Sequence, residues 1–409
     1  MTEKTTRRGM VYLLAVVAVL WVWFATDSGI LMPVDEEAIL AARIFSDTVE
    51  RIRTERTLLG IPIDPETDIH ETGLIGERYT PLTSTLGSLP AKRSGSTPDA
   101  AALLVQLIRR AIDVETAREG DMIVAINCSG SFPGFCVAAL AACSALDLDV
   151  VTTLSIGASS WGANRPDFTL PDIVAAASEP AGSGRTTTPR EPNGPSGDAD
   201  RNPGSIDGAD SDADATDAGN FAAPGSILVT PGGADDRGTD LDPGALEEAL
   251  HRAEEKGFEV YVPENLADAI TRREERYNAA GEVALFVSIG GNAVGTGADA
   301  DVAMWYGVLT PEDPERETVL ADGDRDGLVL RYLRKGVSVV QILNVEQLFS
   351  DRGVVFDPAQ PPAIGDGRLY RQRPGLVHRI ALVVPGIVIV ILLGIALRCY
   401  NGENRRRRV

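Results

Sequence analysis

Lysine is nearly absent from this 409-residue sequence, which holds only Lys4, Lys92, Lys256 and Lys335. Acidic side chains number 59 against 38 lysines and arginines, which gives a formal net charge of -21. A phosphate backbone is bound through a basic surface, so this balance argues against a nucleic-acid-binding protein. It fits an acidic, halophilic-type protein kept soluble in concentrated salt, although a GC-rich genome also replaces lysine by arginine.

Histidine and cysteine are scarce as well, which removes most metal-site patterns. The three histidines are widely separated, and the four cysteines lack the clustered spacing of zinc ligands. Cys136 and Cys143 fall on one face of a predicted helix but about 10 Å apart along its axis, too far for a disulfide. We expect these two and Cys128 to be buried small hydrophobic residues, and we expect no metal ion and no cofactor.

Two apolar runs bracket the chain, at residues 10–32 and 378–398. A membrane-spanning helix needs about 20 apolar residues, so both runs are predicted transmembrane helices. The first also fits an uncleaved signal anchor or a secretory signal peptide. Positive residues concentrate in 1–9 and 399–409, which predicts cytoplasmic termini and a main domain outside the cell membrane.

Between these runs, apolar strands alternate with helical segments. Residues 33–98 are predicted to form an amphipathic helix, as a stalk or packed on the domain, and then a polar loop. Residues 99–377 contain buried runs such as "DMIVAIN" and "EVALFVSIGG" separated by helices. This alternation predicts a three-layer α/β domain with a mostly parallel, Rossmann-like sheet. Residues 179–224 are rich in Gly, Pro, Ser and Asp, and are predicted to be a disordered acidic insertion.

Four loops rich in Gly, Ser or Asn follow predicted strands: "NCSGSFPG", "SIGASSWGAN", "TPGGADDRG" and "SIGGNAVGTG". Ligands of open parallel sheets bind beyond the carboxyl ends of the strands, and glycine lets the backbone approach them closely. We therefore predict a ligand-binding crevice at this edge. Its candidate residues are Ser129, Gly130, Ser131, Ser159, Ser160, Asn164, Gly232, Gly233, Gly290, Gly291 and Asn292.

The first of these loops has a simpler interpretation, in which its serines only cap a helix. Ser129 and Ser131 precede the helix that Pro133 is predicted to open, so either could be its N-cap. A nucleophilic Ser131 is disfavoured, because the G-x-S-x-G pattern is not met around it and no histidine follows a predicted strand as its base. "GGNAVG" lacks the G-x-G-x-x-G spacing of a dinucleotide site.

A polar stretch, residues 77–99, places several Thr and Ser hydroxyls ahead of Lys92 and Arg93. Two cations with neighbouring hydroxyls would suit a carboxylate or a phosphate. A solvated loop whose charges pair with local acids fits the same residues. Both interpretations remain open from the sequence, and Lys92 and Arg93 join the candidate ligand-binding residues.

The motifs "ETGLIGERYTPLTSTLGSLPAKRSGSTPDAAALLV", "SGSFPGF", "LSIGASSWGANRPDFTLPDI", "GGADDRG" and "VSIGGN" occur in this order. Over residues 35–365, apart from the insertion, the chain resembles the poly-γ-glutamate system protein family. The insertion and the strong C-terminal apolar run depart from that pattern. The resemblance implies an accessory membrane protein of poly-γ-glutamate synthesis or export. It implies membrane subunits of that machinery as partners, and it assigns no catalytic residue.

The leading functional hypothesis is thus a membrane-anchored accessory protein whose crevice binds a carboxylate ligand or a partner subunit. The negative net charge opposes loose attraction of an anionic polymer, so binding must be local, through Lys92, Arg93 and backbone N–H groups. Two alternatives remain from other classes: a hydrolase or amide-bond transferase acting on the polymer, and a pure scaffold.

Overall fold

The computed structural model describes residues 33–178, 224–297, 301–313 and 326–372, with isolated positions between 12 and 19 and between 388 and 395. Every helix within these residues is too short or too polar to traverse a bilayer. The two predicted transmembrane segments lie outside the described residues apart from those isolated positions, and the predicted insertion lies outside them apart from Pro224. These three predictions therefore stay predictions.

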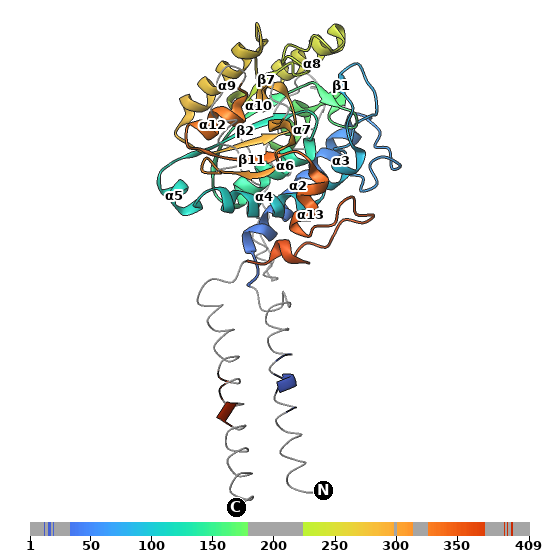
Figure 1. Cartoon of the computed structure of the whole chain (residues 1–409). Coiled ribbons are helices and arrows are strands. Elements are labelled where there is room, and N and C mark those ends of the chain that lie inside the picture. The colour runs from blue at the N-terminus through green and yellow to red at the C-terminus, as the bar shows by residue number, and fades with distance from the viewer. Residues whose placement is uncertain are drawn as a thin grey trace, which may run out of the picture.

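A seven-stranded sheet forms the centre of the body (Figure 1). In spatial order its strands are β10 (Gly307–Leu309), β11 (Ser338–Ile342), β9 (Val283–Ile289), β2 (Ile123–Ser129), β3 (Asp149–Ser155), β7 (Leu228–Thr230) and β8 (Glu259–Val260). β10 pairs with β11 in the antiparallel sense, and all other neighbours are parallel. The predicted α/β class with a mostly parallel sheet is confirmed.

Helices cover both faces of the sheet (Figure 1). Side chains alternate across β2, so Val124, Ile126 and Cys128 join one core while Ile123 and Ala125 join the other. The first core contains α4 (Pro98–Ala111), α6 (Pro133–Ala145), α7 (Leu170–Ser178) and α8 (Pro243–Glu255). The second contains α9 (Leu266–Ala280), α10 (Ala293–Thr296) and α12 (Leu328–Arg334).

A further helix, α2 (Glu36–Leu58), packs across α4 and α6. Helix α6 has the uncharged sequence "PGFCVAALAACSA", and all its residues but Ser144 are buried. Burial all round follows because strands contact one side of α6 and α2 contacts another. Of the two arrangements open from the sequence, α2 as a stalk or as a packed helix, the structure has the packed one.

The remaining elements are short. They are the helices α3 (Leu89–Gly95), α5 (Val114–Glu119) and α13 (Val345–Arg352), and the 3₁₀ turns η2 (Pro224–Ser226), η3 (Val302–Met304) and η5 (Arg368–Tyr370). Strand β1 (Thr83–Thr85) pairs with β4 (Ala158–Ser159), and β5 (Asn164–Arg165) pairs with β6 (Phe168–Thr169). The β1–β4 pair draws the polar stretch 77–88 onto the loop that follows β3.

The order of the strands reverses at β2. The chain passes from β2 to β3 on one side and later returns to β9 on the other. In open α/β sheets this switch point is where the loops on either side diverge and leave room for a ligand. The loops after β2 and β9 are thus the natural walls of a site.

The two ends of the described body meet in a terminal clasp, made of residues 33–35 and 370–372. Val34 bridges Arg371 in the antiparallel sense, and two backbone hydrogen bonds of 2.9 Å flank the pair. Arg109 of α4 forms an ion pair with Asp35 at 2.6 Å, which anchors the clasp to the domain. The chain therefore enters and leaves this body at one place.

Candidate functional site

The four polar loops leave the same edge of the sheet. They follow β2, β3, β7 and β9, which are parallel and adjacent in the order β9, β2, β3, β7. Their carboxyl ends are in register, with Ser129 opposite Ser155 and Cys128 opposite Ile289. The expected placement of these loops at one edge is confirmed, and ligand binding there stays a prediction.

The turn after β2 differs from the expected serine cap. The N-cap of α6 is Phe132, and it makes no side-chain cap hydrogen bond. Ser129 Oγ instead accepts from Ser131 N at 3.3 Å, and Ser131 Oγ accepts from Ser159 N at 3.0 Å. Both hydroxyl oxygens thus accept from backbone N–H groups in the loops at this edge. The prediction that one of them caps the helix is wrong.

Close backbone approach brings the β2 turn against its neighbours. A Cβ atom on Gly130 would lie 2.7 Å from Ile156 O, and one on Gly290 would lie 2.1 Å from Ser129 Oγ. Gly290 also has a φ of +95°, which disfavours any side chain there. These two glycines are therefore required where the β2 turn meets the loops after β3 and β9.

Lys92 enters this turn from α3 and is only 3% exposed. Its Nζ donates to the backbone oxygen of Ser131 and, at 2.8 Å, to Ser159 Oγ. The centroid of the Phe132 ring lies 3.7 Å from the same nitrogen. Burial lowers the pKa of Lys92 to about 7, because removal from water disfavours the charged ammonium.

Arg93 does not share this environment. Its guanidinium donates to the backbone oxygens of Thr67 and Glu66, both at 2.8 Å, and lies 3.7 Å from a carboxylate oxygen of Asp357. The two adjacent cations thus point to different parts of the molecule. The sequence interpretation of one two-cation cluster is wrong, because neighbouring residues of a helix face about 100° apart.

The loop after β3 is held by the polar stretch 77–88. Asn164, fully buried, donates to Glu77 O at 2.7 Å and to Thr83 Oγ1 at 2.8 Å, and its Oδ1 accepts from Glu77 N at 3.0 Å. Ser160 N donates to Thr85 O at 2.9 Å. Asn164 and Ser160 thus serve this packing, and the amide of Asn164 has little capacity left for a ligand.

The loop after β7 is fixed by a buried ion pair that sequence reasoning missed. Arg273 of α9 lies 2.6 Å from a carboxylate oxygen of Asp236 and donates to Thr230 Oγ1 at 2.7 Å. The side chains of Arg273 and Asp236 are at most 1% exposed. Gly232 and Gly233, with φ values of +75° and +79°, let the loop turn back over this pair. The presence of an arginine in the polar pattern of α9 gave no sign of its burial.

The loop after β9 is joined to β2 and β3 through amide and hydroxyl groups. Asn292 caps α10 by accepting from Gly295 N at 2.9 Å, and its Oδ1 also accepts from Asn127 Nδ2 at 3.3 Å. Thr153 links the network onward, to Asn127 at 3.3 Å and to the Tyr277 hydroxyl at 2.6 Å. Gly291, next to Asn292, is exposed. Neutral polar side chains therefore form the base of the switch-point region.

The three described cysteines are free and buried, as expected. Burial raises the pKa of Cys143 to about 12 and raises that of Cys128 as well. A thiol in this state is a poor nucleophile, because the thiolate is the reactive form. Cysteine chemistry at the β2 turn is therefore disfavoured.

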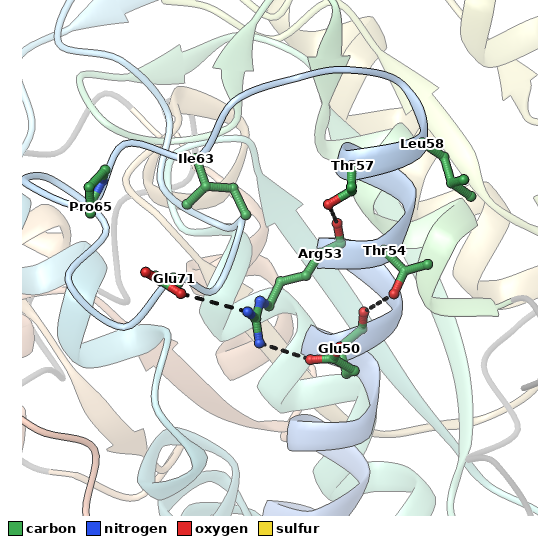
Figure 2. A pocket seen from close by; sticks show the side chains of 8 residues that line it. All are labelled: Glu50, Arg53, Thr54, Thr57, Leu58, Ile63, Pro65 and Glu71. Carbon is green, nitrogen blue, oxygen red and sulfur yellow. Dashed lines mark hydrogen bonds and ion pairs between the residues drawn. The ribbon is translucent and has the colours of Figure 1, made fainter.

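A cavity of about 440 Å³ lies elsewhere, beside the C-terminal half of α2 (Figure 2). Its lining includes Glu50, Arg53 and Glu71, and Arg53 lies 2.9 Å from Glu50 and 3.7 Å from Glu71. Arg53 thus pairs with both carboxylates, and the two acids still outnumber the one cation in this open groove. None of the lining residues belongs to the four loops at the sheet edge.

Comparisons of the chain with protein-family models, with curated proteins and with solved structures find no significant match.

Proposed function

We propose that the chain is a membrane-anchored accessory protein of poly-γ-glutamate synthesis or export, and that the loop edge of its sheet binds a carboxylate. The carboxylate belongs to the polymer or to a partner subunit. The observation that carries the proposal is the position of Lys92, a buried amine that donates to Ser131 O in the loop after β2 and to Ser159 Oγ in the loop after β3. Such a group is costly to bury and is typical of functional sites.

The hydrogen bonds of Lys92 leave capacity for one more partner. An ammonium group has three donors, and Ser131 O and Ser159 Oγ accept two of them. A carboxylate on the third donor would favour the charged form and raise the pKa of Lys92 from about 7. Ser131 and Phe132 are the partly exposed neighbours of Lys92, so they mark the side from which a ligand would reach the amine.

The terminal clasp supports the membrane tether. Residues 33–35 and 370–372 are held together, and each borders one of the predicted transmembrane segments. Two spans that start from one point on the body agree with a chain that crosses the bilayer twice. The negative net charge of the chain also keeps the polymer from binding elsewhere on its surface, so recognition would be confined to the Lys92 region.

The test is a strain in which the gene is deleted and then restored. Loss of poly-γ-glutamate on deletion, and its recovery with the full chain, would support the proposal. A chain without residues 378–398 should fail to restore production, because the body would lose one tether. Normal polymer in the deletion strain would refute the pathway assignment.

A further inference from the structure

Lys92 and Ser159 have the geometry of a base and its nucleophile. The Nζ atom of Lys92 lies 2.8 Å from Ser159 Oγ, within the range of a proton-transferring hydrogen bond. A second bond, to Ser131 O, fixes the direction of the amine. No histidine follows a predicted strand, so the sequence pattern alone did not indicate a base for a serine at this edge. Lysine takes this role when burial holds it neutral.

The surroundings of Lys92 keep part of its population unprotonated near neutral pH. Within the described part of the chain, no ion pair to Lys92 is found, and burial is the cause of its pKa of about 7. Phe132 and Ser131 face the amine of Lys92 from the turn after β2, and Ser159 faces it from β4. Arg93, next to it on α3, is turned toward Thr67 and Asp357.

We propose that Ser159 and Lys92 form a catalytic pair that cleaves or transfers amide-linked acyl groups. Neutral Lys92 takes the proton of Ser159 Oγ while the oxygen attacks the amide carbonyl carbon. The C–N bond then breaks, the Lys92 ammonium returns the proton to the leaving amine, and an ester on Ser159 remains. Water or a second amine then attacks the ester carbonyl carbon while Lys92 takes its proton. The C–O bond to Ser159 breaks, and Lys92 returns the proton to Ser159 Oγ.

The substrate class, a γ-glutamyl amide, rests on the proposed function. The reaction itself does not depend on that assignment. Ser131 acts as a positioning residue, because its Oγ accepts from Ser159 N at 3.0 Å and its carbonyl accepts from Lys92. Gly87 runs beside the nucleophile, and a Cβ there would lie 2.9 Å from Ser159 Oγ. The same Cβ would lie 2.5 Å from Ser160 O, so the backbone at Gly87 packs directly against the loop that carries Ser159.

The test is covalent labelling of the purified full chain with a fluorophosphonate, followed by intact-mass measurement and peptide mapping. The expected result is a single adduct on Ser159, formed at a rate that rises with pH around 7 as Lys92 loses its proton. Ser159→Ala should abolish the adduct. Ser178→Ala, which removes a hydroxyl bonded to Val174 O in α7, should label at the wild-type rate.

Lys92→Arg separates catalysis from structure, since arginine retains donors but does not act as a base. We expect labelling to fall at least a hundredfold. Three results with the wild-type protein alone would overturn the proposal. They are the absence of labelling, labelling at another residue, and a labelling rate that does not change between pH 6 and 9. Equal labelling of Lys92→Arg and wild type would also overturn it.

The outcomes distinguish this proposal from the pathway assignment. Labelling of Ser159 requires no polymer. If Ser159 is labelled but the deletion strain makes normal poly-γ-glutamate, the catalytic pair stands and the pathway assignment is refuted. Polymer loss in the deletion strain, with no adduct in the purified chain, would refute the catalytic pair alone.

Discussion

Lys92 shows how far a single residue can be understood from the sequence. Its rarity, in a chain with four lysines, marked it as a candidate, and the hydroxyls near it suggested a polar site. Its true partners, Ser131 and Ser159, are 39 and 67 residues away. Contacts of that range depend on sheet topology, which residue patterns alone do not specify.

The lowered pKa of Lys92 makes stability depend on pH. The pKa falls from 10.5 when exposed to about 7 in the folded chain, so between these values the unfolded chain binds the extra proton. Stability is therefore greatest above the unfolded pKa and is lost as pH falls toward 7, by about 1.4 kcal/mol per pH unit. Chemical denaturation at pH 7, 8 and 9 should show this slope as the difference between wild type and Lys92→Met. Equal pH dependence of the two proteins would contradict the assigned burial.

The buried pair of Arg273 and Asp236 predicts a larger effect on stability. Arg273→Met leaves the carboxylate of Asp236 uncompensated, and breaking such a pair costs about 3–5 kcal/mol. The exposed ion pair of Arg53 and Glu50 is the matched comparison, and Arg53→Met should cost less than about 1 kcal/mol. Urea unfolding midpoints measure both, and similar midpoints for the two variants would argue against the buried network.

Among the elements, long apolar segments were predicted well and short ones were not. Strand β2 and helix α6 follow directly from "DMIVAIN" and "PGFCVAALAACSA", because continuous burial requires continuous apolar residues. Strand β10 has only three residues, and it forms through its hydrogen-bonded pairing with β11. Phe132 replaces a serine as N-cap for a similar reason, since the neighbouring loops use the hydroxyls of Ser129 and Ser131.

The contact between α3 and α6 depends on glycine and gives a prediction for a whole element. A Cβ on Gly134 would lie 2.4 Å from Gly95 O, so Gly134→Ala must push α3, which carries Lys92, away from α6. We expect a loss of stability and slower labelling of Ser159. Gly244 follows a proline at the start of α8 just as Gly134 does in α6, but its Cβ would meet only Asp242 Oδ1, at 3.5 Å. Gly244→Ala should therefore be neutral or slightly stabilising.

Thermal unfolding and the labelling rate measure this pair of variants. If Gly134→Ala retains both the wild-type melting temperature and the wild-type labelling rate, then α3 does not rest on α6 as described.

At the scale of the whole molecule, the terminal clasp determines where the flanking segments begin. Val34 and Arg371 form a non-hydrogen-bonded antiparallel pair, in which Cα atoms are about 4.5 Å apart, a separation that suits a disulfide. Val34→Cys with Arg371→Cys should therefore form a disulfide on mild oxidation. With a protease site placed between residues 179 and 223, the cleaved halves should stay linked on a denaturing gel until a reductant is added.

Each single cysteine variant is the control and should release its fragments on the same denaturing gel without reductant. Fragments that separate in the oxidised double variant would show that the two ends of the body do not meet.

At this scale, we propose that the loop edge around Lys92 carries the function of a body tethered to the membrane. The most direct measurement restores the deletion strain with Lys92→Met or with Lys335→Met, and determines poly-γ-glutamate together with protein abundance in the membrane fraction. Lys335 is the comparison because its side chain is 46% exposed and lies 2.8 Å from Glu274. We predict that Lys335→Met restores the polymer and that Lys92→Met, present in equal amount, does not. Full production by Lys92→Met would contradict the account.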